Sequence, residues 1–302
     1  MNDDAMPTRA AFVALIGAPN AGKSTLVNRL VGTKVSIVSH KVQTTRALVR
    51  GIMMEGPAQI VLVDTPGIFA PKRRLDRAMV ATAWGGAKDA DIVLVLIDAE
   101  RGLKGEPAEI VAAAKDIRRR KALVINKVDR VKRDTLLKLA ADANAACAFD
   151  RTFMVSALDG SGCADLAAWL SAESPEGPWF YPEDQVSDLP LRQLAAEITR
   201  EKLYLRLHQE LPYAAHVETE EWEDRKDGSV RIRQVIYVER ESQRSIVLGK
   251  GGRTIKAIGE AARKEISELL EQKAHLFLFV KVRENWGDDP ERYRAMGLEF
   301  HD

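Results

Sequence analysis

Gly17-Ala18-Pro19-Asn20-Ala21-Gly22-Lys23-Ser24 is the stretch that decides the fold of the first half of this chain. It follows an apolar run that ends at Ile16, and it opens a segment whose apolar residues recur at helical spacing. In a loop of this kind the backbone amides point inward, and the helix N-terminus adds a partial positive charge. The pattern, placed between a strand and a helix, therefore predicts a phosphate-binding loop.

The residue types within this loop predict separate roles. We expect Lys23 to reach the β- and γ-phosphates of a nucleotide and the Ser24 hydroxyl to ligate Mg²⁺. A glycine-rich turn with a chance lysine is the alternative, and the strand and helix on either side oppose it. The predicted nucleotide contacts in this region are Gly17, Ala18, Pro19, Asn20, Ala21, Gly22, Lys23, Ser24 and Thr25.

A second motif, Asp64-Thr65-Pro66-Gly67, ends a β-branched run. A carboxylate at the end of this strand is expected near the metal, and the amide of Gly67 can approach the γ-phosphate closely because glycine has no side chain. The tetrapeptide alone also fits a capped turn, but its position after the phosphate loop favours the nucleotide role. The residues predicted to contact nucleotide here are Asp64, Thr65, Pro66, Gly67 and Ile68.

A third motif, Asn126-Lys127-Val128-Asp129, follows the next strand but one. It predicts which nucleotide base the site binds. The Asp129 carboxylate can accept hydrogen bonds from guanine N1 and N2, whereas adenine offers neither donor. A helix cap is the alternative for this motif alone. After the last predicted strand, backbone amides of Ser156, Ala157 and Leu158 are expected near guanine O6. The motifs in this order favour GTP over ATP.

Between the loop and Asp64 lies Gln43-Thr44-Thr45-Arg46. One of these threonines could close over Mg²⁺ when the γ-phosphate is present, and we choose Thr45 over Thr44. A solvated threonine pair is the alternative. The predicted magnesium ligands are thus Ser24, Thr45 and Asp64, and the residues predicted to act in hydrolysis are Asn20, Lys23, Thr45 and Gly67.

Residues 11 to 171 alternate between short β-branched runs and helical segments, which is typical of an α/β fold with a mostly parallel sheet. The Glu55-Gly56-Pro57 turn joins two strands so tightly that this pair should be antiparallel. The predicted strands are Phe12–Ile16, Leu48–Met53, Gln59–Val63, Ile92–Ile97, Leu123–Ile125 and Phe153–Val155. The predicted helices are Lys23–Val31, Arg74–Gly85, Glu106–Arg119, Lys132–Ala146 and Cys163–Leu170.

The proline-rich residues that follow predict a linker. Beyond them the order is helix (191–211), strand (214–222), strand (230–239), helix and strand (275–282), with an Asp-Gly hairpin turn between the first two strands. The predicted domains are a nucleotide-binding domain over 1–175, a linker over 176–190, and a smaller α+β domain over 191–302 that ends in a polar tail.

The loop Gly249-Lys250-Gly251-Gly252 precedes the second helix of this smaller domain. Bare backbone in a GxxG loop lets a nucleic-acid strand pass close by. Residues 240–264 hold seven lysines and arginines but only two glutamates, and such a patch is typical of a phosphate-binding face. A solvated helix face is the alternative. The predicted RNA contacts are Arg244, Val247, Leu248, Gly249, Lys250, Gly251, Gly252, Arg253, Ile255 and Lys256.

Length and composition agree with this division. The 302 residues exceed one average domain, and the formal net charge of +1 gives no global signal for nucleic acid or membrane. The apolar runs are far shorter than the roughly 20 residues that span a bilayer. Cys147 and Cys163 lack metal-ligand spacing, so we expect two thiols in a reducing cytosol.

These motifs resemble the translation-factor class of small GTPases. Together with the pattern Val247-Leu248-Gly249-Lys250-Gly251-Gly252, they resemble the Era family of bacterial ribosome-assembly GTPases over nearly the whole chain. The resemblance implies a P-loop GTPase domain with a mostly parallel sheet, followed by a type II KH domain. It also implies GTP and GDP as ligands, Mg²⁺, and binding to the 3′ end of 16S rRNA during assembly of the 30S subunit. In this family the threonine that ligates Mg²⁺ stands immediately before an arginine. The resemblance therefore implies Thr45, which precedes Arg46.

The resemblance also bears on hydrolysis and location. Ile68 follows the DTPG glycine, so the water-orienting glutamine of Ras-like enzymes is absent there. In similar GTPases an asparagine at the position of Asn20 helps to hold K⁺, which implies potassium-stimulated turnover. A monomer in the cytoplasm, with peripheral contact at the inner membrane, is further implied. The rival hypotheses are a P-loop ATPase or kinase, and a signalling GTPase whose second domain docks protein or membrane.

Overall fold

The computed structural model describes residues 7–39, 41, 44–207 and 215–284, together with residues 290, 293, 297 and 298. Parts of the predictions therefore lie outside the described residues: residues 1–6 of the first predicted domain, Gln43, the end of the helix predicted over 191–211, the first position of the strand predicted over 214–222, and most of the polar tail. The chain divides into two compact units, with the boundary between Asp188 and Leu189. Each unit is described by itself.

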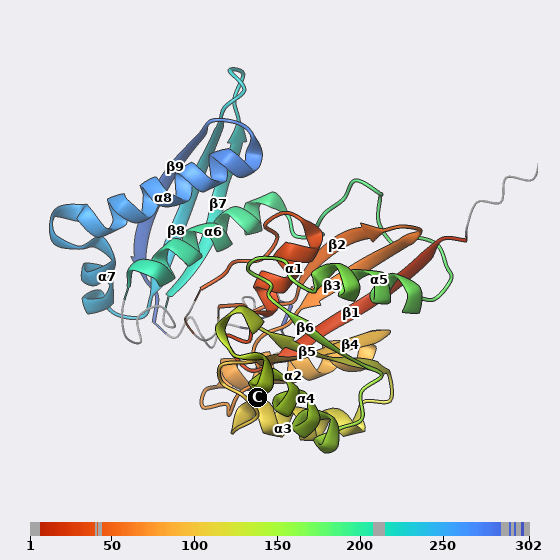
Figure 1. The fold of residues 1–302 in the computed structure, drawn as a ribbon. Coiled ribbons are helices and arrows are strands. Elements are labelled where there is room, and N and C mark those ends of the chain that lie inside the picture. Colours follow the sequence, from red (N-terminus) through yellow and green to blue (C-terminus); the bar gives the residue numbers. More distant parts are fainter. Residues whose placement is uncertain are drawn as a thin grey trace, which may run out of the picture. The chain divides into compact units, whose positions relative to one another are not determined.

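The first unit contains a six-stranded sheet of order β2-β3-β1-β4-β5-β6 (Figure 1). All neighbouring strands are parallel except β2 and β3, which form the antiparallel pair expected from the Glu55–Pro57 turn. The predicted fold class is thereby confirmed. The strands are β1 (Arg9–Gly17), β2 (Val49–Glu55), β3 (Ala58–Asp64), β4 (Ile92–Asp98), β5 (Arg120–Asn126) and β6 (Arg151–Val155).

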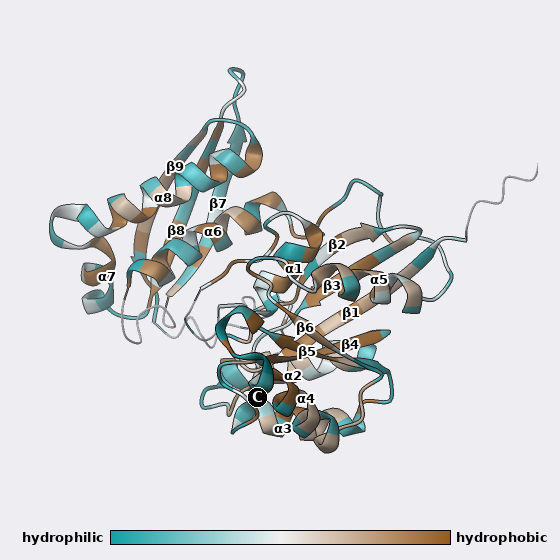
Figure 2. Cartoon of the chain, in the orientation of Figure 1, coloured by the Kyte–Doolittle hydropathy of each residue, from teal (hydrophilic) through white to brown (hydrophobic). Residues whose placement is uncertain are grey.

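Helices cover both faces of this sheet, because its central strands are apolar on both sides. One core lies under α1 and α5, and the other lies under α2, α3 and α4. Figure 2 shows brown, hydrophobic colour concentrated along the central strands. The helices are α1 (Lys23–Val31), α2 (Arg74–Asp89), α3 (Glu106–Ala113), α4 (Arg133–Ala146) and α5 (Cys163–Glu173). The helix predicted over 106–119 is shorter, since a 3-10 turn (Ala114–Asp116) ends it.

The sheet positions the three nucleotide motifs at one edge. Parallel strands β1, β3 and β5 end at Gly17, Asp64 and Asn126 respectively, so each motif begins where its strand stops. In open α/β sheets ligands bind at the carboxyl ends of the strands. The fold therefore brings together residues from distant parts of the chain, such as Ala21 and Asn126, which lie 105 positions apart.

Residues of the predicted 176–190 linker are hydrogen-bonded to the first unit. The Gln59 amide donates to Tyr181 O (2.8 Å) and its oxygen accepts from the backbone N–H groups of Phe180 and Tyr181 (2.8 and 2.9 Å). Farther along, the Arg50 guanidinium pairs with Asp188 at 2.7 Å, and Ser187 Oγ donates to Arg50 O. Proline content alone indicated a spacer, but these hydrogen bonds fasten the segment along β3 and β2.

The second unit is a three-stranded sheet of order β7-β8-β9, in which β7 and β8 are antiparallel and β8 and β9 are parallel. Its elements are α6 (Leu191–Arg206), β7 (Ala215–Asp224), β8 (Val230–Val238), α7 (Glu241–Leu248), α8 (Arg253–Leu270) and β9 (Ala274–Val282). Helix α7 was missing from the predicted order because its apolar residues, 246–248, are consecutive and show no helical spacing. Its Val247 side chain is buried in the core with Ile236 and Ile258.

Two remaining expectations concern membranes and thiols. In the described parts of the chain, no helix combines the length and the apolar character needed to cross a bilayer. Cys147 and Cys163 are both free thiols and both buried.

Candidate functional site

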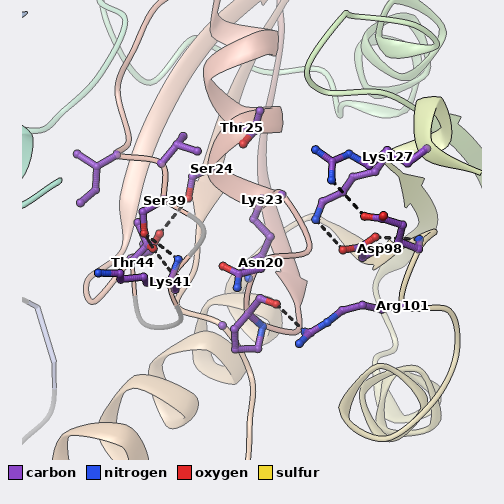
Figure 3. Close-up of a pocket in the computed structure, with 18 residues that line it drawn as sticks. Asn20, Lys23, Ser24, Thr25, Ser39, Lys41, Thr44, Asp98, Arg101 and Lys127 are labelled. Carbon is purple, nitrogen blue, oxygen red and sulfur yellow. Dashed lines mark hydrogen bonds and ion pairs between the residues drawn. The ribbon is translucent and has the colours of Figure 1, made fainter. Parts of the chain in front are cut away.

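The phosphate loop borders a cleft of about 500 Å³ at the edge of the sheet (Figure 3). Its backbone conformation requires glycine at position 22, where φ is 93° and an added Cβ would lie 2.2 Å from Asn126 Nδ2. Helix α1 begins at the next residue, Lys23, so its N-terminal amides face the cleft. This arrangement suits a polyphosphate.

Lys23 is buried within this loop. Its ammonium donates to the carbonyl oxygens of Gly17 (3.1 Å) and Ala18 (3.3 Å). Burial lowers the pKa of Lys23 to about 8, and the nearby Asp64 carboxylate offsets part of that effect. An anionic ligand would favour the charged form of the lysine, as the β- and γ-phosphates of a nucleotide would do.

Asp64 gathers the hydroxyl groups of three residues around one oxygen. Its Oδ2 accepts from Ser24 (2.6 Å), Ser36 (2.7 Å) and Thr45 (3.2 Å). Its Oδ1 is buried and has no hydrogen-bond partner among the described residues. Burial raises the pKa of Asp64, and the charge of Lys23 and these three hydroxyls oppose the rise.

These oxygen atoms fit a magnesium site that is completed by a nucleotide. The described residues contain no cluster of three histidine, cysteine or acidic side chains that could hold a metal alone. Mg²⁺ commonly takes one or two carboxylates together with phosphate oxygens and water, and the buried Asp64 Oδ1 offers an acceptor for such a partner. Ser24 and Thr45 hydroxyls lie 3.0 Å apart. Thr44 instead donates to Lys41 O at 2.7 Å and also contacts Ser39 Oγ.

The residues after Asp64 divide into those that face the cleft and those that do not. Gly67 lines the cleft, and a Cβ there would lie 2.9 Å from Pro19 Cα. Thr65, Pro66 and Ile68 are buried instead. Thr65 Oγ1 donates to Leu15 O (2.6 Å), and Ile68 N donates to the carbonyl of Gly17, the first residue of the phosphate loop (3.0 Å). These three residues hold Gly67 against the phosphate loop without offering side chains to a ligand.

A second cavity of about 140 Å³ adjoins the cleft and brings the predicted base contacts together. The buried Asn126 side chain organises it: the amide donates to Ala21 O (2.9 Å) and the oxygen accepts from Ala157 N (3.0 Å). Asn126 thus ties the phosphate loop to the Ser156–Leu158 turn. The cavity is lined by Gly22, Thr25, Asn126, Lys127, Asp129, Arg130, Ser156, Ala157 and Leu158. Val128 is the one predicted base contact outside this lining, and it packs against the core.

The GxxG loop of the second unit joins α7 to α8. All three of its glycines have positive φ, and a Cβ on Gly249 would lie 2.1 Å from Thr254 Oγ1. Cβ atoms on Gly251 and Gly252 would meet no described atom within 4 Å. Gly249 is therefore required by packing, whereas the other two leave open space beside the backbone.

The side chains near this loop separate into exposed and buried groups. Lys250, Arg253 and Lys256 are exposed, and Ile246 is 56% exposed. Val247, predicted to contact RNA, is fully buried. Val247 packs into the core while its neighbour Ile246 is exposed, because adjacent residues of a helix point in different directions. The predicted apolar contacts Leu248 and Ile255 are partly exposed.

Comparison with known proteins identifies the family. Residues 12–127 match the family model described as 50S ribosome-binding GTPase, and residues 210–287 match the KH domain model. Proteins named GTPase Era from Brucella suis and Rhizobium meliloti are 74% and 73% identical to the chain. Each alignment covers 98% of this chain and 96% or 95% of the relative. The chain belongs to the Era family.

Solved Era structures share the whole fold. A variant of Era from Aquifex aeolicus, bound to GDP and AlF4⁻, is 36% identical, with a TM-score of 0.90 over 96% of this chain and 99% of that chain. An Era complex with MgGDPNP and nucleotides 1506–1542 of 16S ribosomal RNA matches with the same identity, TM-score and coverage. The Era-type domain pair inferred from the sequence is therefore confirmed.

Several residues at the Era-type nucleotide site were not found from the sequence. Asp98 ends β4 and pairs with Lys127 at 2.6 Å, and Ser36 donates to Asp64. Arg29 of α1 donates to Ala157 O (3.1 Å) and to Leu158 O. Only Asp98 carried a signal, since it stands at the carboxyl end of a parallel strand, where ligand sites form.

Proposed function

We propose that this chain hydrolyses GTP to GDP and phosphate, binds the 3′ region of 16S rRNA, and assists assembly of the 30S subunit. The observation that carries the nucleotide half is a convergence. Residues of the phosphate loop line the cleft together with Ser24 and Thr45, whose hydroxyls contact the buried Asp64, and the adjoining cavity with Asp129 shares lining residues with this cleft. A single guanosine triphosphate with Mg²⁺ would satisfy all three.

Each group has a part in binding and hydrolysis. Lys23 and the loop amides hold the β- and γ-phosphates, and Asp129 accepts hydrogen bonds from guanine. Mg²⁺, when bound by Ser24, Thr45 and Asp64, supplies positive charge to the phosphate oxygens. Thr45 and the amide of Gly67 contact the γ-phosphate side, so their segments are released when hydrolysis removes it.

Asn20 is the residue that we propose to assist hydrolysis through K⁺, since Ile68 occupies the position after Gly67 and is buried. Asn20 has a φ of 65° and lines the cleft. Turnover should be faster in potassium than in sodium chloride at equal ionic strength, and Asn20→Ser should remove the difference. Asn144→Ser, an exposed asparagine on α4, is the control. Equal rates in the two salts with no effect of Asn20→Ser contradict this part.

RNA binding is proposed for the GxxG surface, with Lys250, Arg253 and Lys256 contacting phosphates and Ile246 contacting bases. A variant with Lys250→Asp and Gly251→Asp should lower affinity for an RNA of the 16S 3′ sequence at least about tenfold. Its GTP turnover without RNA should be unchanged. Lys226→Asp, in the exposed β7–β8 hairpin, is a control with the same change at a lysine. Full RNA affinity in the double variant would favour a second unit that docks protein or membrane.

Coupling between nucleotide and RNA is also proposed. Strand β2 begins at Val49, four residues after Thr45. Residues 175–188, the last of the first unit, contact this strand through the Arg50–Asp188 ion pair and the hydrogen bond from Ile52 N to Val186 O. A rearrangement around Thr45 therefore has a short path to the start of the second unit, along the backbone to Arg50 and through its ion pair with Asp188. RNA affinity should differ between the GDP and GDPNP states. Identical affinities would contradict the coupling.

The domain limits 1–175 and 191–302, a monomeric state, and a cytoplasmic location with peripheral contact at the inner membrane complete the proposal. The boundary after Asp188, which lies inside the predicted 176–190 linker, supports the division into two domains, and membership of the Era family is the ground for the monomer and the location. Sedimentation of the purified chain tests the monomer. Fractionation of cells, with a salt wash of the membrane pellet, tests the location.

A further inference from the structure

The loop after β4 forms a side of the cleft that no nucleotide motif includes. Asp98 organises this loop, since its Oδ1 accepts from Glu100 N (2.9 Å) and its carbonyl accepts from Gly102 N (3.0 Å). Ala99 N donates to Asn126 O at 2.9 Å. Together with the ion pair between Asp98 and Lys127, these bonds fasten the loop to the base-binding motif.

This fixed loop directs Arg101 toward the phosphate loop. The Arg101 Nη1 donates to the carbonyl oxygen of Pro19 at 3.2 Å, and both residues line the cleft beside Asn20 (Figure 3). The contact is made by a charged donor, and such hydrogen bonds are stronger than neutral ones. A cation therefore holds one particular peptide of the loop.

The geometry of that peptide gives the contact a consequence for the ligand. The peptide bonds of the described residues are trans, and in a trans peptide the carbonyl and the N–H point in opposite directions. The Pro19 carbonyl points to Arg101, so the Asn20 N–H points away from Arg101. The same contact polarises the peptide and makes its N–H a better donor.

We infer that Arg101 is a positioning residue for GTP hydrolysis: it orients the Pro19–Asn20 peptide so that the Asn20 N–H donates to the oxygen joining the β- and γ-phosphates. This inference rests on the proposed function. Negative charge grows on that oxygen as the γ-phosphoryl group leaves. A donor aimed there stabilises the transition state more than the bound GTP substrate.

The test compares Arg101→Ala, Arg101→Lys and the control Arg118→Ala, an exposed arginine after α3. Removing a whole donor of this kind costs roughly 10²–10³ in kcat. Arg101→Ala leaves the Asn20 N–H donor in place but weakens and misorients it. The kcat for GTP should therefore fall about tenfold. Affinity for the slowly hydrolysed GTPγS, which keeps the bridging oxygen, should change less than about threefold, and affinity for GDP with AlF4⁻ should fall as much as kcat. Arg101→Lys should recover part of the loss, and Arg118→Ala should match the parent.

Two results would overturn the inference. One is an Arg101→Ala variant with unchanged kcat. The other is an equal loss of kcat and of GTPγS affinity, which indicates general damage to the loop. A parent protein without GTP turnover is a different result, because it removes the proposed function before Arg101 is considered.

Discussion

The nucleotide site and the GxxG surface, both of which we propose to bind phosphates, are built in opposite ways. In the first unit the central groups are buried: Lys23 is 6% exposed, Asp64 0% and Asn126 1%. In the second unit the basic side chains and Ile246 stand in solvent. The buried site holds its groups with internal hydrogen bonds, as Lys23 does within its loop and Asn126 between two motifs. The exposed surface combines open space beside the backbone with nearby charge.

This difference explains how specific each site is. A buried charge is costly unless a partner compensates it, so the first site favours a ligand with charges in matching places. Exposed lysines bind phosphate at any sequence and are screened by salt. We therefore expect substitutions in the first unit to change which ligand binds, and those in the second to change mainly how tightly RNA binds.

Asp129→Asn is the substitution with the largest expected effect. The substitution replaces the Asp129 carboxylate by an amide, whose N–H donor would face a donor of guanine. GTP affinity should therefore fall about 100-fold, while affinity for xanthosine triphosphate rises. Competition binding with the two nucleotides measures the exchange. Asp134→Asn, exposed on α4, is the control. A variant that still prefers GTP would break the claim that the first site selects its ligand by paired groups.

Asn126→Ala tests the claim that the buried site is internally bonded. It leaves Ala21 O and Ala157 N without their side-chain partner, so the free energy of unfolding of the nucleotide-free protein should fall by about 2 kcal/mol. Urea denaturation followed by fluorescence measures this loss. Asn144→Ala is the control, because the side-chain hydrogen bonds of Asn144 are exposed. Its free energy of unfolding should stay within about 0.5 kcal/mol of the parent.

Ile246→Ala and Val247→Ala sharpen the comparison within the second unit. Truncating the buried Val247 should lower the free energy of unfolding by about 1–2 kcal/mol. Truncating the exposed Ile246 should leave stability unchanged and weaken RNA binding several-fold. Thermal unfolding and RNA titration on both variants separate the two effects. An RNA defect confined to Val247→Ala would place the base contact elsewhere.

The smallest expected effect is a pH dependence of the buried lysine. In the nucleotide-free protein the pKa of Lys23 is lowered to about 8, while bound phosphates favour its charged form. As pH rises through 8, the free protein loses a proton that the complex keeps, so GDP affinity should fall several-fold between about pH 7.5 and 9. Lys23→Arg does not titrate in this range and controls for ionisation of the nucleotide.

The same lowered pKa gives a prediction for stability in the absence of nucleotide. The unfolded chain, with an ordinary lysine pKa near 10.5, binds more protons than the folded chain between about pH 8 and 10.5. The contribution of Lys23 to stability should therefore increase with pH across that range. Comparing parent and Lys23→Arg by denaturation isolates this contribution.

The sequence by itself determined the fold class, the order of the nucleotide motifs and the GxxG loop. Each of these depends on residue types at fixed local spacing, as in the run from Gly17 to Ser24. The choice of Thr45 over Thr44 rested on the family resemblance. In the structure Thr45 contacts Ser24 and Asp64, while Thr44 donates to Lys41 O.

Only the tertiary structure decided which other residues join the motifs at the nucleotide site. Ser36, Arg29, Asp98 and Arg101 reach the site because strand ends and loops from separate parts of the chain meet at one edge of the sheet. The attachment of 175–188 through Gln59 and Arg50 has the same origin, as does the burial of Val247. Contacts between residues far apart in the chain leave no local period or motif, so folding alone reveals them.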